Sequence, residues 1–273
     1  MSDIGIIGYG IVGKAVEYGF KNENNRVLYY DKYKVSDRLK HVMENSMFIF
    51  ICLPTPYKND RIDLSIIDDI MEEIARLCND TEKIIIIKSS VVPGTTRKYA
   101  QIYSRCRFCF NPEFLTEANY LEDFVNADRI ILGADDDKIS LAVTDLYRNR
   151  FPKISIFRTD LTTAEMVKYM ANCLLATKVI FANEMYDLCE KLGIKYEEVK
   201  NMVIADSRIG KTHLDVTSLR GFGGKCFPAN MISVIGLYKE LGIDCSLLET
   251  VWNKNLRIRK IKDWEEIPFV KSE

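Results

Sequence analysis

The sequence predicts an α/β protein whose first part is a doubly wound parallel sheet and whose second part is an all-helical domain. In the first part, short apolar strands alternate with helical segments, a pattern typical of a parallel sheet covered by helices on both faces. In the second part, the stretch from Thr162 to about Gly193 contains no internal proline or glycine and has helical apolar spacing. The predicted domains are residues 1–160 and 161–262, followed by a short tail over 263–273.

A glycine-rich turn follows the first predicted strand, Ile4–Ile7. It reads Gly8-Tyr9-Gly10-Ile11-Val12-Gly13, and a helical pattern follows it. In such a turn the first glycine permits the tight bend, the second lets the backbone approach a pyrophosphate, and the third lets helix and strand pack closely. The turn could be purely structural, but strand, turn and helix together predict a Rossmann-type dinucleotide-binding domain. Its expected cofactor contacts here are Gly8, Gly10, Ile11, Val12 and Gly13.

The second predicted strand, Val27–Tyr30, ends at Asp31. A carboxylate at this place can bond the ribose hydroxyls of a dinucleotide, and it would repel the 2′-phosphate of NADP. The expected cofactor is therefore NAD.

Further strands are predicted at residues 48–52, 83–87, 108–110 and 129–132, with a helix over Leu64–Cys78 among the segments between them. Ligands of doubly wound sheets bind beyond the carboxyl ends of the strands. Three segments occupy such positions: Leu53–Pro56, Ser89–Thr95 and Asn111–Glu117. One such segment alone would be read as a turn or a helix cap, but three along one edge favour an active site.

Two expectations concern particular residues of these segments. A helix starting near Pro112 would place Glu113 and Glu117 on one face, because they are four residues apart. Thr95 is a candidate cap for the helix that follows it.

The second part contains one long predicted helix, which Thr162 or Thr163 could cap and Gly193 would end. Lys168 and Asn172 share a face of it. Further helices are predicted over residues 197–203, 227–241 and 247–262. The apolar surface of this part predicts a homodimer that pairs through the helical domain.

Cys226 follows a Gly-Gly turn just ahead of a predicted helix. A helix N-terminus stabilises negative charge and therefore favours a thiolate. Combined with a cofactor that accepts hydride, a nucleophilic thiol suggests oxidation of an aldehyde through a thioester. The alternative is that Cys226, like most cysteines, is a small buried hydrophobe.

Composition narrows the class of protein. The chain has 273 residues and a formal net charge of −1, which argues against nucleic acid or a polybasic membrane contact as the main partner. No apolar run approaches the ~20 residues of a membrane span. We expect a cytoplasmic protein with reduced thiols, because no export signal is apparent at the N-terminus. Its two histidines, His41 and His213, are far apart, so no metal site is expected.

The ordered motifs resemble the UDP-glucose/GDP-mannose dehydrogenase family. The resemblance runs from residue 3 to about 260 and is carried by the glycine turn and the following stretches: CLPTP (52–56), KSSVVPGTT (88–96), NPEFLTEANYLEDFVNADRIILG (111–133), AEMVKYMANCLLATKVIFANE (164–184), DSRIG (206–210) and GFGGKCFPAN (221–230).

The resemblance implies an enzyme that oxidises the primary alcohol of a nucleotide sugar to a carboxylate and reduces two NAD. It implies that Cys226 is the thiol that forms a thiohemiacetal and then a thioester. Lys168 and Asn172 would stabilise the oxyanion. Glu113 and Glu117 are the paired glutamates, and Glu117 or a water would assist proton removal. We expect further cofactor contacts at Pro54, Thr55, Ser90 and Glu117.

Two departures from the family pattern affect this expectation. Ala229-Asn230 stand where the family usually has Lys-Asp, and an asparagine cannot accept a proton as the aspartate could. The family also continues into a third domain that completes the nucleotide site, which the 273 residues do not include. The leading hypothesis is oxidation of UDP-glucose to UDP-glucuronate. The alternatives are an impaired NAD-binding remnant that acts as partner or regulator, and an NAD-dependent dehydrogenase of a smaller hydroxy acid.

Overall fold

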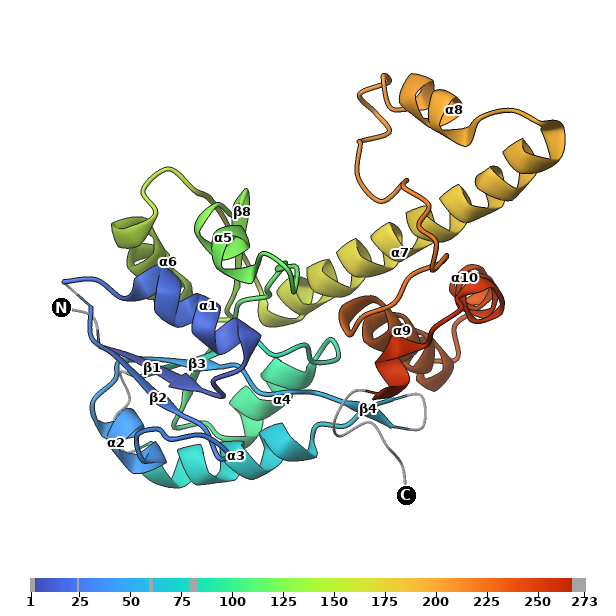
Figure 1. The fold of residues 1–273 in the computed structure, drawn as a ribbon. Coiled ribbons are helices and arrows are strands. Elements are labelled where there is room, and N and C mark those ends of the chain that lie inside the picture. The colour runs from blue at the N-terminus through green and yellow to red at the C-terminus, as the bar shows by residue number, and fades with distance from the viewer. Residues whose placement is uncertain (1–2, 24, 59–60, 79–82, 267–273) are drawn as a thin grey trace. The chain divides into compact units, whose positions relative to one another are not determined.

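The chain forms two compact units. In a computed structural model, which describes residues 3–23, 25–58, 61–78 and 83–266 (Figure 1), the first unit comprises Met1–Thr55 and Asp63–Lys168. The second comprises Pro56–Ile62 and Tyr169–Glu273. A short segment of the first half of the chain therefore belongs to the second unit, and the other boundary falls within one long helix.

The first unit is built on a seven-stranded sheet in the order β2-β1-β3-β6-β7-β8-β9. Its strands are β1 (Ile4–Ile7), β2 (Val27–Tyr30), β3 (Phe48–Ile51), β6 (Ile84–Ile87), β7 (Arg107–Phe110), β8 (Arg129–Gly133) and β9 (Ser155–Thr159). The first five pair in parallel, as predicted. β8 runs antiparallel to β7, and β9, which was not predicted, pairs in parallel with β8. The chain enters β8 from the side of the sheet on which β7 ends, so β8 and β9 run opposite to the other strands.

Helices cover both faces of this sheet (Figure 1). They are α1 (Ile11–Phe20), α2 (Leu39–Glu44), α3 (Ser65–Leu77), α4 (Thr95–Ile102), α5 (Tyr120–Val125) and α6 (Asp137–Arg150). Side chains alternate between the faces of a strand, so Ile49 and Ile51 of β3 pack with α2, α3 and α4, whereas Phe48 and Phe50 pack with α1, α5 and α6. The two apolar cores that result fix the strand ends at which the site lies.

The second unit contains a hairpin and several helices. Its elements are β4 (Tyr57–Lys58), β5 (Arg61–Ile62), residues 169–192 of α7 (Leu161–Leu192), α8 (Tyr196–Val203), α9 (Cys226–Glu240), α10 (Ser246–Ile258) and a 3₁₀ helix, η1 (Asp263–Glu266). The hairpin was not predicted. Of the tail predicted over 263–273, Trp264 is buried against Trp252, with ring centroids 5.6 Å apart, and residues 267–273 lie outside the described residues.

The ends of α7 are set by Asp160 and Gly193. The carboxylate of Asp160 accepts the N–H of Thr163 at 3.1 Å, so the predicted cap at Thr162 or Thr163 is wrong. The hydroxyl of Thr163 donates to the same carboxylate instead. At the other end Gly193 has a φ of 69°, and the N–H of Ile194 reaches the carbonyl of Cys189 at 3.1 Å. This left-handed glycine ends the helix as predicted.

The helix predicted near Pro112 does not form. The chain from Asn111 to Thr116 is irregular, and α5 begins only at Tyr120. The carboxylate of Glu113 accepts the N–H of Leu115 at 2.8 Å, a local bond that competes with helix formation. Glu113 and Glu117 therefore do not share a helix face: Glu113 is mostly buried, and Glu117 is exposed.

Candidate active site

The glycine turn between β1 and α1 has the geometry of a phosphate cradle. A Cβ on Gly8, whose φ is +93°, would lie 2.6 Å from the carbonyl oxygen of Cys52, and one on Gly13 would lie 2.2 Å from that of Gly8. Apart from Gly10 itself and its two chain neighbours, no atom of the described residues lies within 4 Å of the Cβ position of Gly10. In the part of the chain that the structure describes, no side chain caps α1, and the first turn of this helix carries no acidic residue. The N-terminus of α1 can therefore donate backbone N–H groups to a pyrophosphate, and the turn has room for one. Ile11 and Val12 are the first two residues of this helix.

Asp31 lies directly beyond β2 and is joined to this turn. Its carboxylate accepts the N–H of Tyr9 at 2.8 Å and that of Tyr33 at 2.9 Å. The side chain of Asp31 remains half-exposed, so its oxygens can also accept ribose hydroxyls. These features fit the NAD expected from the sequence.

Buried side chains join the three polar segments at the strand ends. Ser89 connects the first two: its hydroxyl accepts the N–H of Leu53 at 2.9 Å and donates to the carbonyl of Leu53 at 2.8 Å. Pro54 is exposed at this edge, and Thr55 and Ser90 are half-buried. The segments therefore do lie along one edge of the sheet.

Lys88 connects the second and third segments. Its ammonium, which is buried, donates to Oδ1 of Asn111 at 2.9 Å and to the carbonyl of the same residue at 3.3 Å. Tyr147 donates to the same amide oxygen, and Nδ2 of Asn111 reaches the carbonyl of Ile131 at 2.8 Å. Burial lowers the pKa of Lys88 to about 8.

Lys168 and Glu113, both predicted site residues, form a buried ion pair. Nζ of Lys168 lies 2.7 Å from Oε1 of Glu113 and also donates to its carbonyl oxygen. Burial by itself raises the pKa of the Glu113 carboxyl, but the ammonium of Lys168 and the N–H of Leu115 hold it below the usual value. Glu113 is thus an ionised partner that fixes Lys168 rather than a proton acceptor.

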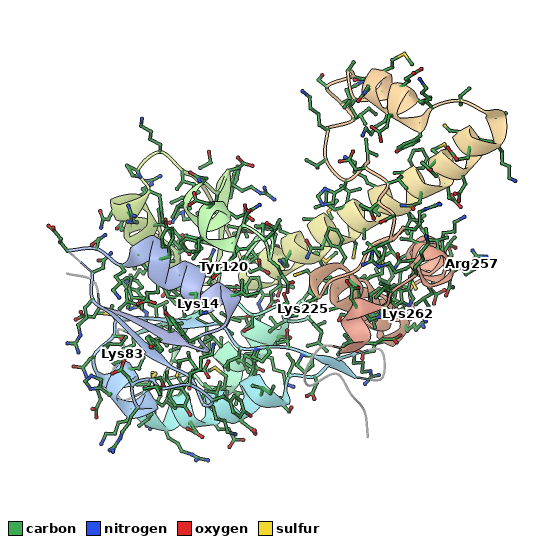
Figure 2. The ribbon with its side chains drawn as sticks, in the orientation of Figure 1. Lys14, Lys83, Tyr120, Lys225, Arg257 and Lys262 are labelled. Carbon is green, nitrogen blue, oxygen red and sulfur yellow. The ribbon has the colours of Figure 1, made fainter. Side chains whose placement is uncertain are left out.

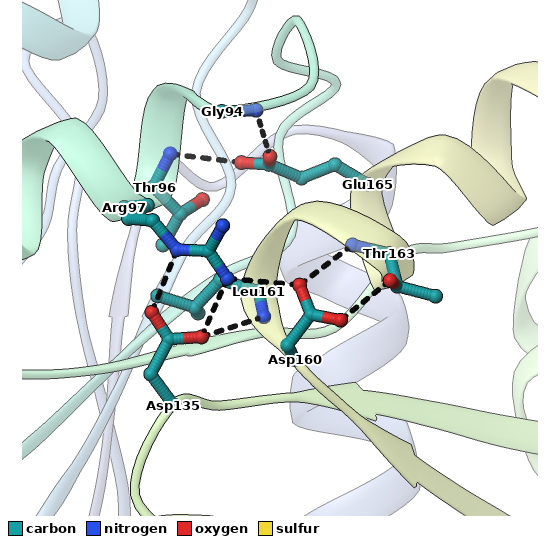
Figure 3. Close-up of polar contacts among 8 residues, drawn as sticks. All are labelled: Gly94, Thr96, Arg97, Asp135, Asp160, Leu161, Thr163 and Glu165. Carbon is teal, nitrogen blue, oxygen red and sulfur yellow. Dashed lines mark hydrogen bonds and ion pairs between the residues drawn. The ribbon is translucent and has the colours of Figure 1, made fainter.

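Glu165, one turn before Lys168 on α7, holds the second polar segment (Figure 3). Its wholly buried carboxylate accepts the N–H of Thr96 at 2.8 Å and that of Gly94. Gly94, with a φ of +99°, is the N-cap of α4, so Thr95 does not cap this helix as predicted. The first turns of α7 therefore fix two of the three segments, one through Glu165 and the other through Lys168.

An ion-pair network lies next to Glu165 (Figure 3). Arg97 binds Asp135 at 2.8 Å and Asp160 at 2.9 Å. Because Asp160 also caps α7, this arginine ties α4 to the start of α7 and to the end of β8.

Cys226 is the first residue of α9 in the second unit. It follows Gly224, whose φ is +71°, and Lys225 at the start of the helix (Figure 2). Cys226 is half-buried, whereas the other seven cysteines are buried. Burial raises the pKa values of the Cys52, Cys109 and Cys173 thiols to about 12. The expected turn before a helix is therefore present, and Cys226 is the most accessible thiol.

Asn172 and Asn230, both buried in the second unit, each leave one amide atom unused. Nδ2 of Asn230 donates to the carbonyl of Cys226 at 2.7 Å. Within the described residues, no hydrogen-bond partner contacts Oδ1 of Asn230 or Nδ2 of Asn172. A buried polar atom without a partner is costly, so both atoms are candidates for contact with a ligand or a water.

Several residues that shape these sites were not predicted as site residues: Lys88, Ser89 and Glu165. Their partners are mostly backbone groups far away in sequence, which no local spacing reveals. Lys88 and Ser89 do lie within one of the motifs, and their position directly after an apolar strand is the sequence feature that could have identified them as site residues.

The described residues contain no group of three or more histidine, cysteine or carboxylate side chains that could hold a metal ion. In the same part of the chain, no helix has both the length and the apolar character needed to cross a membrane.

Known proteins match the chain in both units. Residues 14–151 match the NAD-binding domain of the UDP-glucose/GDP-mannose dehydrogenase family, and residues 162–257 match its central domain. UDP-glucose 6-dehydrogenase of Rickettsia prowazekii is 32% identical over 85% of this chain and 58% of the relative. TuaD of Bacillus subtilis, also a UDP-glucose 6-dehydrogenase, is 33% identical over 78% of this chain and 47% of the relative. The chain spans about half the length of the curated relatives it matches.

Solved structures share the fold. A UDP-glucose dehydrogenase from Pyrobaculum islandicum superposes with a TM-score of 0.85 at 26% identity, over 94% of this chain and 68% of that one. A 3-hydroxyisobutyrate dehydrogenase from Mycobacterium tuberculosis gives 0.75 at 13% identity, over 94% and 93%, a likeness of fold alone. The family match confirms the predicted NAD-binding domain, and the chain belongs to the UDP-glucose/GDP-mannose dehydrogenase family.

Proposed function

We propose that the chain carries the NAD-binding and catalytic parts of a nucleotide-sugar dehydrogenase. Its reaction is the oxidation of a primary alcohol to a carboxylate, with UDP-glucose as the expected substrate and UDP-glucuronate as the product. We also propose that it acts in the cytoplasm as a homodimer that pairs through the second unit. The observation that carries the proposal is Cys226, a half-buried thiol on the first residue of a helix in a chain of this family.

The residues divide the chemistry between them. NAD supplies the hydride acceptor for each of the two oxidations. The Cys226 thiolate adds to the aldehyde carbon, and the oxyanion takes up a proton to give a thiohemiacetal. Loss of hydride from that carbon and of the proton from its hydroxyl group leaves a thioester, which water cleaves to a carboxylate, a free thiol and a proton.

The reaction also requires hydrogen-bond donors that stabilise the negative charge on the oxyanion. Nδ2 of Asn172 is a buried donor that has no partner among the described residues. The amine of Lys168 is oriented by its ion pair with Glu113. Ser90 and the exposed Glu117 remain proposed contacts of the cofactor and of a catalytic water.

Asn230 is the weak point of the chemistry. Its amide is bonded to the Cys226 carbonyl and can orient water, but it cannot take a proton. Thioester hydrolysis should therefore be slow, and an adduct on Cys226 should accumulate. We expect Asn230→Asp to raise the rate by up to about 10²–10⁴-fold, the contribution of a general base, and by less if Glu117 already serves that purpose.

The test measures NADH formation with UDP- and GDP-sugars, together with the intact mass of the protein after incubation with NAD and UDP-glucose. NADH release, or an adduct that Cys226→Ser abolishes, supports the proposal. If Asn230→Asp yields neither NADH nor adduct, the proposal fails.

That negative result would favour a second candidate, an NAD-binding partner or regulator without turnover. The amide at position 230, where a base would be needed, is the observation in its favour. NADH formation from a small 3-hydroxy acid, independent of Cys226, would instead indicate a hydroxy-acid dehydrogenase, whose simpler oxidation needs no thiol.

A further inference from the structure

The backbone that leads into Cys226 is held by three other segments of the second unit. We call residues 220–226 the thiol loop. Asn183 of α7, Asn255 of α10 and Asp263 of η1 each accept one backbone N–H from this loop. The loop itself has no regular structure before Cys226, so these side chains replace the hydrogen bonds that a helix or a sheet would supply.

Asn255 makes the most complete of these contacts. It is wholly buried, and its Oδ1 accepts the N–H of Phe222 at 2.8 Å. Its Nδ2 returns a bond to the carbonyl of Phe222 at 3.1 Å. A Cβ on Gly221, whose φ is +53°, would lie 2.3 Å from Oδ1 of Asn255. The glycine is therefore required by the close approach of this amide to the backbone.

Asp263 makes an equivalent contact two residues closer to the thiol. Its Oδ2 accepts the N–H of Gly224 at 3.1 Å and pairs with Arg259 at 3.0 Å. A Cβ on Gly223 would lie 2.3 Å from the guanidinium of Arg259 and 2.4 Å from Oδ1 of Asp263. Arg259 also donates to the carbonyl of Arg220 at 3.2 Å, so the pair holds both ends of the loop.

We propose that Asn255 and Asp263 are positioning residues for the thiol of Cys226. They hold the glycines of the thiol loop in the conformation that starts α9 at Cys226, where the positive end of the helix dipole stabilises a thiolate. The inference rests on the proposed function, which assigns Cys226 as the nucleophile, but its test needs neither substrate nor cofactor.

The test measures the alkylation rate of each cysteine by iodoacetamide, with peptide mapping, on the full chain. Asp263→Ala removes the acceptor for Gly224, and Asp263→Asn keeps an oxygen there. We expect Asp263→Ala to slow alkylation of Cys226 by about two- to fivefold, the effect of a helix terminus on a charge, and Asp263→Asn to restore most of the rate. Asn255→Leu, which removes both bonds to Phe222, should slow it similarly.

The other cysteines separate positioning from loss of structure. A loosened fold would speed labelling of buried thiols such as Cys173 and Cys189, whereas a positioning effect slows Cys226 alone. Asp215→Ala is the matched control, because its carboxylate pairs with Lys200 in the same unit. The inference is overturned if Asp263→Ala leaves the rate of Cys226 unchanged or raises it, or if the buried thiols accelerate with it. If Cys226 of the unaltered protein labels no faster than the buried thiols, the proposed nucleophile fails, and this inference fails with it.

Discussion

We expect Asp31 to decide between the two nicotinamide cofactors. Its carboxylate is anchored by two backbone N–H groups and is open to a ribose. We expect NADH to bind at least about tenfold more tightly than NADPH, and Asp31→Ser to remove most of this preference, because a hydrogen bond to a charged group contributes about 1.5–3 kcal/mol. Fluorescence titration with both cofactors measures it, with Asp37→Ser as the control. Equal affinities in the unaltered protein would mean that Asp31 does not face the ribose.

Lys88 makes the stability of the first unit depend on pH. Burial lowers its pKa from 10.5 to about 8, so its charged form costs the fold about 3 kcal/mol below pH 8. Between pH 8 and 10.5 the folded state releases this proton before the unfolded chain does, and the free energy of unfolding therefore rises with pH.

Lys88→Met removes this charge. We expect the stability of the variant relative to the unaltered protein to fall by about 3 kcal/mol as the pH rises from 7.5 to 10.5. Urea unfolding across that range measures the difference. Lys14→Met, at an exposed lysine, is the control and should show no such trend (Figure 2). A difference for Lys88→Met that does not vary with pH would contradict the assignment.

Site residues were predictable where their signal lies in a short stretch of sequence. Gly8, Gly10, Gly13 and Asp31 follow one spacing rule, and the structure shows the tight turn on which this rule depends, whereas their contact with a cofactor stays a prediction. Asn255 and Asp263 escaped notice because they bind the backbone more than thirty residues away. Many polar residues can bond to a distant backbone group, so no local sequence pattern identifies Asn255 and Asp263.

Glu165 supplies the capping side chain that α4 lacks. The N-cap residue Gly94 has no side chain to bond the first N–H groups of α4, and the carboxylate of Glu165 bonds that of Thr96 as well as the N–H of Gly94 itself. Glu165→Gln would turn an amide N–H toward one of these donors. We expect it to lower the free energy of unfolding by about 1–3 kcal/mol, the cost of a buried unsatisfied group, whereas Glu190→Gln, at an exposed site on α7, should have little effect. Urea unfolding of both variants tests this, and equal stabilities would exclude the capping role.

Helices were predicted well where their apolar spacing is long, and poorly where a local side chain competes with the backbone. α3 and α7 agree with prediction to within a residue at each end. The helix near Pro112 failed because Glu113 bonds the N–H of Leu115. The caps of α4 and α7 were assigned to threonines, but carboxylates from Glu165 and Asp160 bind the helix N–H groups.

The exposed apolar side of α7 predicts self-association. Five of its apolar side chains in the second unit are more than half exposed: Met170, Leu174, Phe181, Leu188 and Leu192. An apolar stripe of this kind is typical of an interface. We expect light scattering at micromolar concentration to give twice the 31.5 kDa chain mass. Phe181→Glu should yield a monomer, whereas Leu141→Glu, at an exposed site of the first unit, should not. A monomeric unaltered protein would remove the proposal.

The sheet order shows what pattern alone could not resolve. Apolar strands at residues 129–132 and 84–87 look alike in sequence, yet β8 and β6 run in opposite directions. The direction of a strand depends on the side from which the chain enters the sheet. The amino-acid composition of the strand does not indicate this direction.

The hairpin β4–β5 makes the second unit discontinuous in sequence. Ile62 of this hairpin is buried, Arg61 pairs with Glu240 of α9 at 2.9 Å, and β5 packs against α9. A fragment that starts at Tyr169 would lack this hairpin and would expose the α9 surface it covers. The helix that carries Cys226 therefore depends for its packing on a segment made more than a hundred residues earlier. During synthesis, the hairpin β4–β5 therefore cannot reach its final packing until the ribosome has made α9.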